Sequence, residues 1–359
     1  MCHMNQFPWW FLIGAVLSVA ACGKSGGGNP PPVTQPPPTV VDQFSNPLLP
    51  SGPDPWVIRK ENFYYYTHTQ GNKISLWRTS KMSELKNAPV QTVWSAPASG
   101  ENVHNVWAPE LHYLNNKWYL YYTAGATPDH STQRSFVLEN SSADPRTGSW
   151  TDRGKIADVT ADFFAIDGTV LSYNNKNYFI WSGHESATDK TQRLYIAVMS
   201  DPWTLSGSRQ LISSPEFAWE KAGAPPAVNE APQVLMNPDG KVFLIFSASG
   251  CWTDDYALGM LSLKTGGDPM NVADWAKSPQ PVFVKNPANG VYGPGHNSFF
   301  TSADNKESWI LYHANSASGQ GCGDARNPRM QKFNWRQDGT PDFGLPLNIN
   351  TRLDKPGGE

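Results

Sequence analysis

Three carboxylates stand at the same point of a pattern that recurs along this chain. They are Asp54 in the stretch PDPWV, Asp167 in IDGTV and Glu230 in NEAPQ. Each is followed by an apolar, strand-like run, a polar turn and an aromatic-rich strand. In a closed repeat protein, equivalent positions face a common axis. Three carboxylates that converge there would form an acid/base site, where one carboxyl donates a proton and another accepts one.

The elements that must position these residues are short strands in five similar units. The units begin near residues 54, 109, 167, 230 and 296, a spacing of roughly 55 to 66 residues. Each holds three clear strands, and a fourth, outer strand is marked by Trp94, Trp150, Trp203 and Trp275. No amphipathic helix of useful length interrupts the pattern. The sequence therefore predicts an all-β protein, a five-bladed β-propeller with about four antiparallel strands per blade.

The first residues of the inner strands would then line one mouth of the central channel. We expect this ring to contain Asp54, Glu110 or its neighbours, Asp167, Glu230 and His296. The alternative is that Asp-Pro and Asn-Glu are ordinary turn formers on a solvated rim. Glycoside hydrolysis needs two carboxyl groups in different protonation states. A third carboxylate helps to separate those states, because like charge raises a neighbour's pKa. The trio therefore favours hydrolysis over simple binding.

Composition narrows the function further. The chain has 359 residues and a formal net charge of -3, and no cluster of Lys or Arg stands out, which disfavours nucleic acid as a partner. It contains 15 Trp and 13 Tyr, whose flat rings suit the faces of sugars, although most of them are expected in the core.

The N-terminal segment reads as an export signal. The apolar run from Trp9 to Ala21 is too short to span a bilayer and ends in VAAC, which resembles a lipoprotein box with Cys22 as the acylated residue. One departure is that no Lys or Arg precedes the run. We expect a lipoprotein of the bacterial cell envelope, anchored in a membrane and facing the periplasm or exterior. The predicted segments are a signal peptide at 1–21, a Gly/Pro-rich tether at 22–41, the propeller at 42–351 and a tail at 352–359.

Two cysteines remain outside the leader. Cys251 and Cys322 each lie beside Gly in a predicted loop. In an oxidising compartment they could form a disulfide, but the sequence does not give their separation. A bridge and two free thiols both stay open.

The motifs around the carboxylates resemble those of glycoside hydrolase family 43, whose fold is a five-bladed β-propeller. The resemblance rests on PDPWV at 53–57, WAPE at 107–110, IDG at 166–168 and NEAP at 229–232, and covers about residues 42 to 350. It implies an inverting mechanism. Asp54 would be the general base, Glu230 the general acid, and Asp167 the residue that raises the pKa of Glu230 and orients it.

The resemblance also implies contacts around the trio. Trp107 would stack beside the terminal sugar, Ile166 would line the same site, and Arg329 would grip sugar hydroxyls, with a structural salt bridge as its alternative. His296 would contact substrate and would order water around a channel metal ion such as calcium. The chemistry itself needs no cofactor, and the chain has no acidic calcium loop. Tyr122, Ser249 and Trp252 are candidate rim contacts.

The substrate is the least constrained expectation. The segments at 249–259 and 321–333 look most like the exo-acting α-L-arabinofuranosidase branch, which predicts a monomeric enzyme acting on arabinose-containing polysaccharides or oligosaccharides. Alternatives within the family are a β-xylosidase, an endo-arabinanase or an arabinoxylan-debranching enzyme. A surface-anchored propeller that binds carbohydrate without cleaving it is the non-enzymatic alternative, although such a protein has no need for the full trio.

Overall fold

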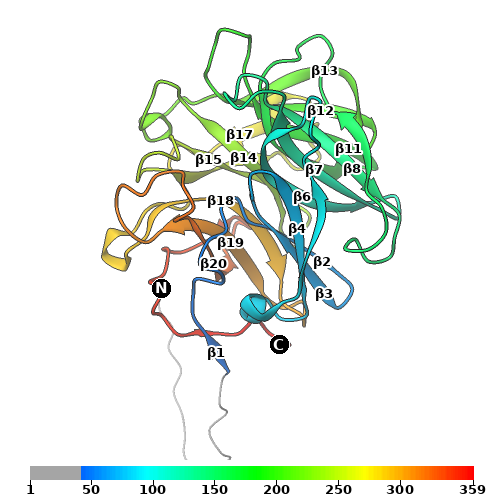
Figure 1. Ribbon diagram of the computed structural model, residues 1–359. Coiled ribbons are helices and arrows are strands. Elements are labelled where there is room, and N and C mark those ends of the chain that lie inside the picture. The colour runs from blue at the N-terminus through cyan, green and yellow to red at the C-terminus, as the bar shows by residue number, and fades with distance from the viewer. Residues whose placement is uncertain (1–41) are drawn as a thin grey trace, which may run out of the picture. The chain divides into compact units, whose positions relative to one another are not determined.

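The computed structural model describes residues 42–359, which form five four-stranded antiparallel sheets arranged around one axis (Figure 1). This confirms the predicted five-bladed β-propeller. The predicted signal peptide and the predicted tether, Cys22 included, lie outside the described residues. Within residues 42–359, none of the helices has the length and apolar character needed to cross a membrane.

Each blade is built from four consecutive strands. The first two blades contain β2 (Trp56–Lys60), β3 (Phe63–Thr67), β4 (Lys73–Thr79), β5 (Val90–Ser95), and β6 (His104–Leu114), β7 (Lys117–Gly125), β8 (Arg134–Asn140), β9 (Thr151–Lys155). The third and fourth contain β10 (Ala165–Tyr173), β11 (Lys176–Gly183), β12 (Arg193–Asp201), β13 (Thr204–Ser213), and β14 (Asn229–Met236), β15 (Val242–Ala248), β16 (Ala257–Leu263), β17 (Trp275–Lys277). The fifth contains β18 (Tyr292–Thr301), β19 (Ser308–Asn315), β20 (Asn327–Trp335) and β21 (Pro341–Asp342).

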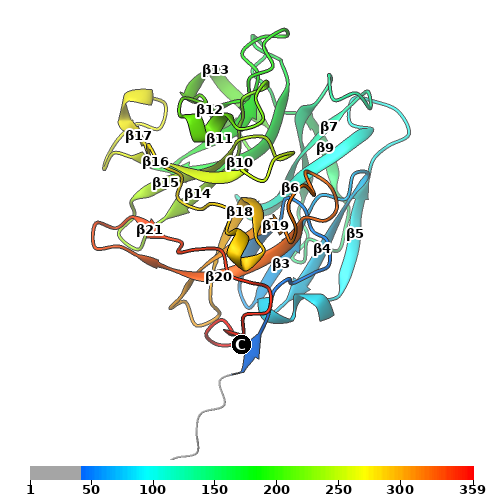
Figure 2. The same ribbon diagram turned by 90° about the vertical axis from the view of Figure 1, so that its left-hand side faces the viewer.

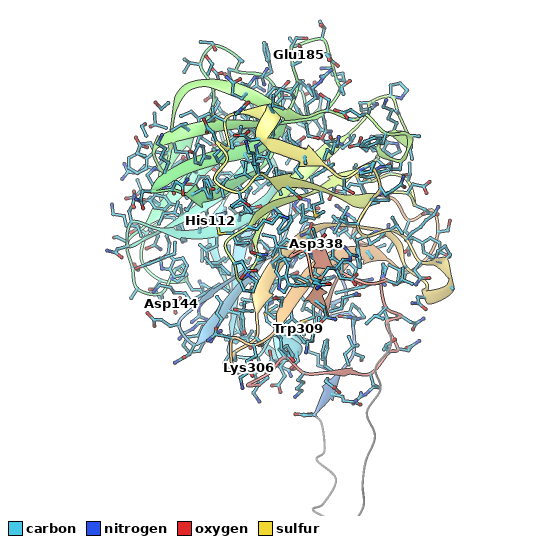
Figure 3. The ribbon with its side chains drawn as sticks, turned by 180° about the vertical axis from the view of Figure 1, so that it is seen from behind. His112, Asp144, Glu185, Lys306, Trp309 and Asp338 are labelled. Atoms are coloured by element: carbon cyan, nitrogen blue, oxygen red, sulfur yellow. A yellow bond between two sulfur atoms is a disulfide. The ribbon has the colours of Figure 1, made fainter. Side chains whose placement is uncertain are left out.

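The first strand of each blade lies near the axis. Figure 2 shows β6, β10, β14 and β18 near the middle of the view, with the outer strands β5, β13, β17 and β21 at the periphery. Four short 3-10 helices lie in the connections: η1 (Met82–Asn87), η2 (Ala218–Lys221), η3 (Val272–Asp274) and η4 (Pro287–Asn289). Glu185, after β11, and Lys306, before β19, lie at opposite edges of the molecule (Figure 3).

The ends of the described segment close the ring. β1 (Gln43–Phe44) pairs with β22 (Leu353–Asp354), and Figure 1 shows β1 beside the C-terminal end. The side chain of Asn46 donates to the carbonyl of Met330 and accepts from its N–H, both at 2.9 Å, as a neighbouring strand would. Residues 352–359, predicted as a tail, are therefore partly folded onto the propeller.

The hydrophobic core consists of five clusters, and each fills the seam between two adjacent blades. The second strands are buried on both faces; eight of the nine residues of β7 are buried. Their sequences are accordingly near-continuous aromatic and apolar runs rather than alternating ones. Burial of these runs is the main term that stabilises the ring.

A left-handed residue lies within each inner strand, or two residues before it in the first blade. These residues are Asp54, Ala108, Asp167, Ala231 and His296, with φ angles of 57°, 44°, 56°, 49° and 43°. Non-glycine residues rarely adopt such angles, and where they do the surroundings must hold them. The same kink at five equivalent places shows that the repeat is one of backbone geometry as well as of sequence.

Candidate active site

One pocket at the mouth of the channel contains all three predicted carboxylates. Its volume is about 410 Å³, within the range of sites for small molecules. The lining residues include Asp54, Thr69, Trp107, His130, Phe164, Ile166, Asp167, Gln192, Glu230, Cys251, Trp252, His296, Cys322 and Arg326. The pocket thus brings together residues from all five blades.

Asp54 is buried and held by four groups. Its Oδ1 accepts from Arg326 at 2.8 Å, and its Oδ2 accepts from the hydroxyl of Thr69 at 2.7 Å. Its backbone N–H donates to Nδ1 of His313 at 3.0 Å, and Nδ1 of His296 lies 3.3 Å from Oδ1. Burial opposes ionisation, but the positive charge of Arg326 and the Thr69 hydrogen bond outweigh it and hold the pKa of Asp54 well below its usual range. Asp54 is therefore an ionised carboxylate across the physiological pH range.

Glu230 has the opposite electrostatic character. Burial and then the negative charge of Asp54 raise the pKa of Glu230 to about 7, although a hydrogen bond from Tyr256 acts against the rise. The Tyr256 hydroxyl donates to Oε1 of Glu230 at 2.8 Å and fixes the direction of the carboxyl. Glu230 is the more exposed of the three carboxylates and can reach a ligand in the pocket.

Asp167 lies beside Glu230 and binds the backbone of the residue that follows it. Burial, followed by the charge of Glu230, raises the pKa of Asp167 well above its usual range. Its Oδ2 accepts from the N–H of Ala231 at 3.0 Å, the residue directly after Glu230. Asp167 and Glu230 together therefore retain a proton at pH values where isolated carboxyls have lost it, and Asp167 fixes the backbone that carries Glu230.

The positions of the trio in the repeat are not identical. Asp54 and Asp167 are themselves the left-handed residues of their blades, whereas Glu230 precedes the left-handed Ala231. Glu230 thus stands one residue earlier than the sequence pattern predicted. This offset separates Glu230 from the position of the two aspartates and places it beside Tyr256 instead.

Three of the four residues predicted to contact the sugar lie at the pocket. Trp107, Ile166 and His296 line it, and the ring of His130 packs edge-on against Trp107, with ring centroids 4.7 Å apart. Glu110 lies on β6 away from the pocket lining. It is buried, binds Nε2 of His112 at 2.8 Å and accepts a hydrogen bond from Gln233. Figure 3 labels His112.

Arg329 does not lie in the pocket. Its side chain is fully buried, with Nε donating to Asn327 at 2.8 Å and Nη2 donating to Ser316 at 2.9 Å. Arg326, three residues earlier, lines the pocket instead. The difference is one of strand register, because β20 begins at Asn327 and leaves Arg326 in the preceding loop. A contact between Arg329 and substrate hydroxyls does not fit this geometry.

Two of the three candidate rim residues also lie elsewhere. Tyr122 is buried and accepts a hydrogen bond from Asn102, and the buried Ser249 hydroxyl donates to the Trp219 carbonyl. Trp252 does line the pocket. The structure joins Cys251 and Cys322 by a disulfide, which links the β15–β16 loop to the β19–β20 loop beside Trp252.

The surroundings of His296 do not fit a metal held directly by protein side chains. No group of three or more His, Cys, Asp or Glu residues within residues 42–359 is arranged to hold a metal ion. Calcium takes about six to eight oxygen ligands, whereas the carboxylate next to His296 is already bound by Arg326 and Thr69. Burial also lowers the pKa of His296, which favours its neutral form. A channel calcium ion that His296 orders through water stays a prediction, and no chemical step is assigned to it.

Sequence reasoning missed the groups that bind the carboxylates from loops of the same blade or of the adjacent one. Arg326, Thr69 and Tyr256 each bind a member of the trio. Arg326 and Tyr256 lie in the two loops that carry Cys322 and Cys251. The cysteine pair could therefore have identified these loops as neighbours and as candidate parts of the site. Thr69 follows an aromatic strand and carries no comparable mark in the sequence.

The family model for glycosyl hydrolases family 43 matches residues 44–341. The chain is 42% identical over 312 residues to an extracellular exo-α-(1→5)-L-arabinofuranosidase of Streptomyces avermitilis, covering 85% of this chain and 64% of that protein. It is 36% identical over 275 residues to a protein of the same description from Streptomyces chartreusis, covering 76% and 82%. The crystal structure of an α-L-arabinofuranosidase from Lactobacillus brevis superposes with a TM-score of 0.80 at 34% identity, covering 86% of this chain and 98% of that one. The chain thus spans just under two thirds of the length of the Streptomyces avermitilis relative.

The raised pKa of Glu230 predicts a pH-dependent cost in stability. An acid whose pKa is higher in the folded state binds more protons there, so stability falls as the pH rises from about 4 towards the folded-state pKa. Glu230→Gln removes this cost while keeping an acceptor for Tyr256. We expect the free energy of unfolding at pH 8 to rise by on the order of 1–3 kcal/mol, and the gain to vanish near pH 4, as measured by urea unfolding.

The exposed Glu101→Gln is the matched control, with no gain expected at either pH. An equal gain for Glu230→Gln at pH 4 and pH 8 would contradict the electrostatic origin of the effect.

Proposed function

Because this chain belongs to glycosyl hydrolases family 43, we propose that it is an inverting glycoside hydrolase that releases terminal α-L-arabinofuranosyl residues from arabinan or related arabinose-containing polysaccharides and oligosaccharides. The observation that carries the proposal is the unequal protonation of the carboxyls in one pocket. Asp54 is held ionised, and the pKa of Glu230 is raised to about 7. The substrate class is supported by the arabinofuranosidases to which the chain is similar.

Hydrolysis follows from these two states. Asp54 accepts a proton from a water molecule that attacks the anomeric carbon, while Glu230 donates its proton to the leaving oxygen. One bond to the sugar forms as the other breaks, which inverts the anomeric centre. Afterwards Asp54 is protonated and Glu230 ionised, and exchange with solvent restores both.

The neighbouring side chains have separate roles in this step. Arg326 keeps the base ionised, Tyr256 aims the acid, and Asp167 holds the backbone beside the acid. Trp107 lies beside the place of the terminal sugar. No step requires a cofactor, since Asp54 and Glu230 supply both the base and the acid.

The first test is product analysis. The purified protein is incubated with linear 1,5-arabinan, branched arabinan, arabinoxylan and xylo-oligosaccharides, and the released sugars are identified. We expect monomeric arabinose. Release of xylose alone would contradict the proposed substrate and indicate a β-xylosidase. Release of longer arabino-oligosaccharides would indicate endo action. Binding without any product would favour a carbohydrate-binding propeller.

The variants Glu230→Gln and Asp54→Asn test the assigned roles. Glu230→Gln should lower kcat on arabinan by roughly 10²–10⁴-fold, and far less on an aryl arabinofuranoside whose leaving group needs no proton. Asp54→Asn should abolish hydrolysis of both substrates, because water activation is needed in each. Equal losses on both substrates for Glu230→Gln would remove Glu230 from the role of general acid.

Arg326→Met tests how the base is kept ionised. Loss of the guanidinium removes the strongest of the interactions that oppose the burial of Asp54, so its pKa rises and protonation disables it at a higher pH. The acid limb of the pH profile of kcat/KM should therefore move upward by about one unit or more. The exposed Arg352→Gln should leave the limb in place, and an unmoved limb in Arg326→Met would show that another group sets the pKa of Asp54.

We further propose that the protein is exported and anchored through a lipid on Cys22. The lipoprotein-like VAAC sequence supports this proposal, as do the relatives described as extracellular. When the full chain is expressed in a bacterium, it should partition into the detergent phase with the membrane fraction, and Cys22→Ser should move it to the aqueous phase. Aqueous partitioning of the unaltered chain would contradict an anchor.

A further inference from the structure

Trp252 is a large exposed aromatic side chain on the wall of the pocket. Its exposed fraction is 45%, and it is the aromatic member of the exposed large apolar residues within residues 42–359. It lines the same pocket as the three carboxylates. An exposed aromatic ring at a polar site is typical of a binding surface.

The ring of Trp252 is held in place rather than free to turn. A Cβ atom at Gly250 or at Gly223 would collide with the indole, so the ring lies directly over two stretches of bare backbone. Its Nε1 donates to the carbonyl of Gly223 at 3.3 Å. The ring thus has a fixed orientation before any ligand arrives.

The loop that carries Trp252 is also fixed to the next blade. The disulfide from Cys251 to Cys322 joins it to the β19–β20 loop. Asp254 accepts from the N–H of Gly319 at 2.9 Å and from the hydroxyl of Ser318. A platform fixed on both sides binds with little loss of conformational entropy.

The position of Glu230 shows which part of a substrate faces this platform. Glu230 on β14 must reach the oxygen of the leaving group, and Trp252 lies in the β15–β16 loop of the same blade. Tyr256, four residues further along that loop, binds the carboxyl of Glu230. The base Asp54 belongs to the first blade, so the attacking water and the leaving group approach from different blades.

We propose that Trp252 is the platform of the leaving-group subsite, on which the first sugar beyond the cleaved bond stacks. The proposal rests on the hydrolase function proposed above and adds a determinant of specificity to it. Its ligand is a neutral furanose or pyranose unit, whose C–H face packs on the indole. Stacking of this kind reads the face of a sugar and not its identity, so arabinosyl and xylosyl leaving groups both fit.

Two substrates with the same arabinosyl group separate this role from a structural one. α-1,5-Linked arabinobiose has a sugar leaving group, whereas α-L-arabinofuranosyl fluoride has none that could stack. For Trp252→Ala, the ratio of kcat/KM for arabinobiose to that for the fluoride should fall roughly tenfold or more, which corresponds to about 1.4 kcal/mol. Trp252→Phe should recover part of the ratio, because it keeps an aromatic face.

The exposed Val272→Ala on the same blade is the matched control and should leave the ratio unchanged. An unchanged ratio in Trp252→Ala, which includes equal losses of kcat/KM on both substrates, would overturn the proposal, because the leaving group would then lie elsewhere. If the unaltered protein released arabinose from neither substrate, the proposed function itself would fail. The two failures are therefore distinguishable.

Discussion

The site depends on how each blade satisfies one backbone N–H of the next. The N–H of each left-handed residue points away from the hydrogen bonds between the strands of its own blade. It therefore needs an acceptor from elsewhere. At four seams the preceding blade supplies it. The acceptors are Thr69 for Ala108, Thr123 for Asp167, Ser247 for His296 and His313 for Asp54. At the remaining seam, between the third and fourth blades, the acceptor is the carboxylate of Asp167, which binds Ala231.

This substitution gives Asp167 two roles that cannot be separated. The third blade has a hydroxyl at the equivalent place, that of Ser182, but it donates to the carbonyl of Asn229. The N–H of Ala231, beside Glu230, is bound by the carboxylate of Asp167 instead. A carboxyl in that place fixes the backbone beside Glu230, and burial and the charge of Glu230 raise its own pKa. A hydroxyl there could hold the backbone but could not share a retained proton with Glu230. The chemistry thus uses a hydrogen bond that the propeller requires in any case.

The sequence predicted what repeats and missed the contacts that the connecting loops make with the carboxylates. The period and the aromatic second strands identified the five blades, since those strands are buried on both faces. The trio was found because each of its carboxylates stands just ahead of an apolar, strand-like run in its repeat unit. Arg329 was chosen over Arg326 because register at the start of β20 decides which arginine reaches the pocket, and no local pattern fixes that register. Thr69 and Tyr256 lie 15 and 26 residues from the carboxylates that they bind, each beyond the second strand of the same blade, so the contacts became visible only once those loops were placed.

In the proposed mechanism, catalysis and specificity rest on different parts of the fold. The carboxylates sit on inner strands whose kinks are fixed by the seams, and a change there alters the chemistry and the fold together. Phe164, His130 and Trp252 instead lie in connections between strands. Of these connections, that of Trp252 is cross-linked to the next blade by a disulfide. A rigid wall beside the acid suits a leaving group whose oxygen must meet a fixed proton, because misplacement by about 1 Å lowers the rate by a large factor. The loops of the second and third blades can therefore vary with the substrate, whereas the wall beside Glu230 must keep its position.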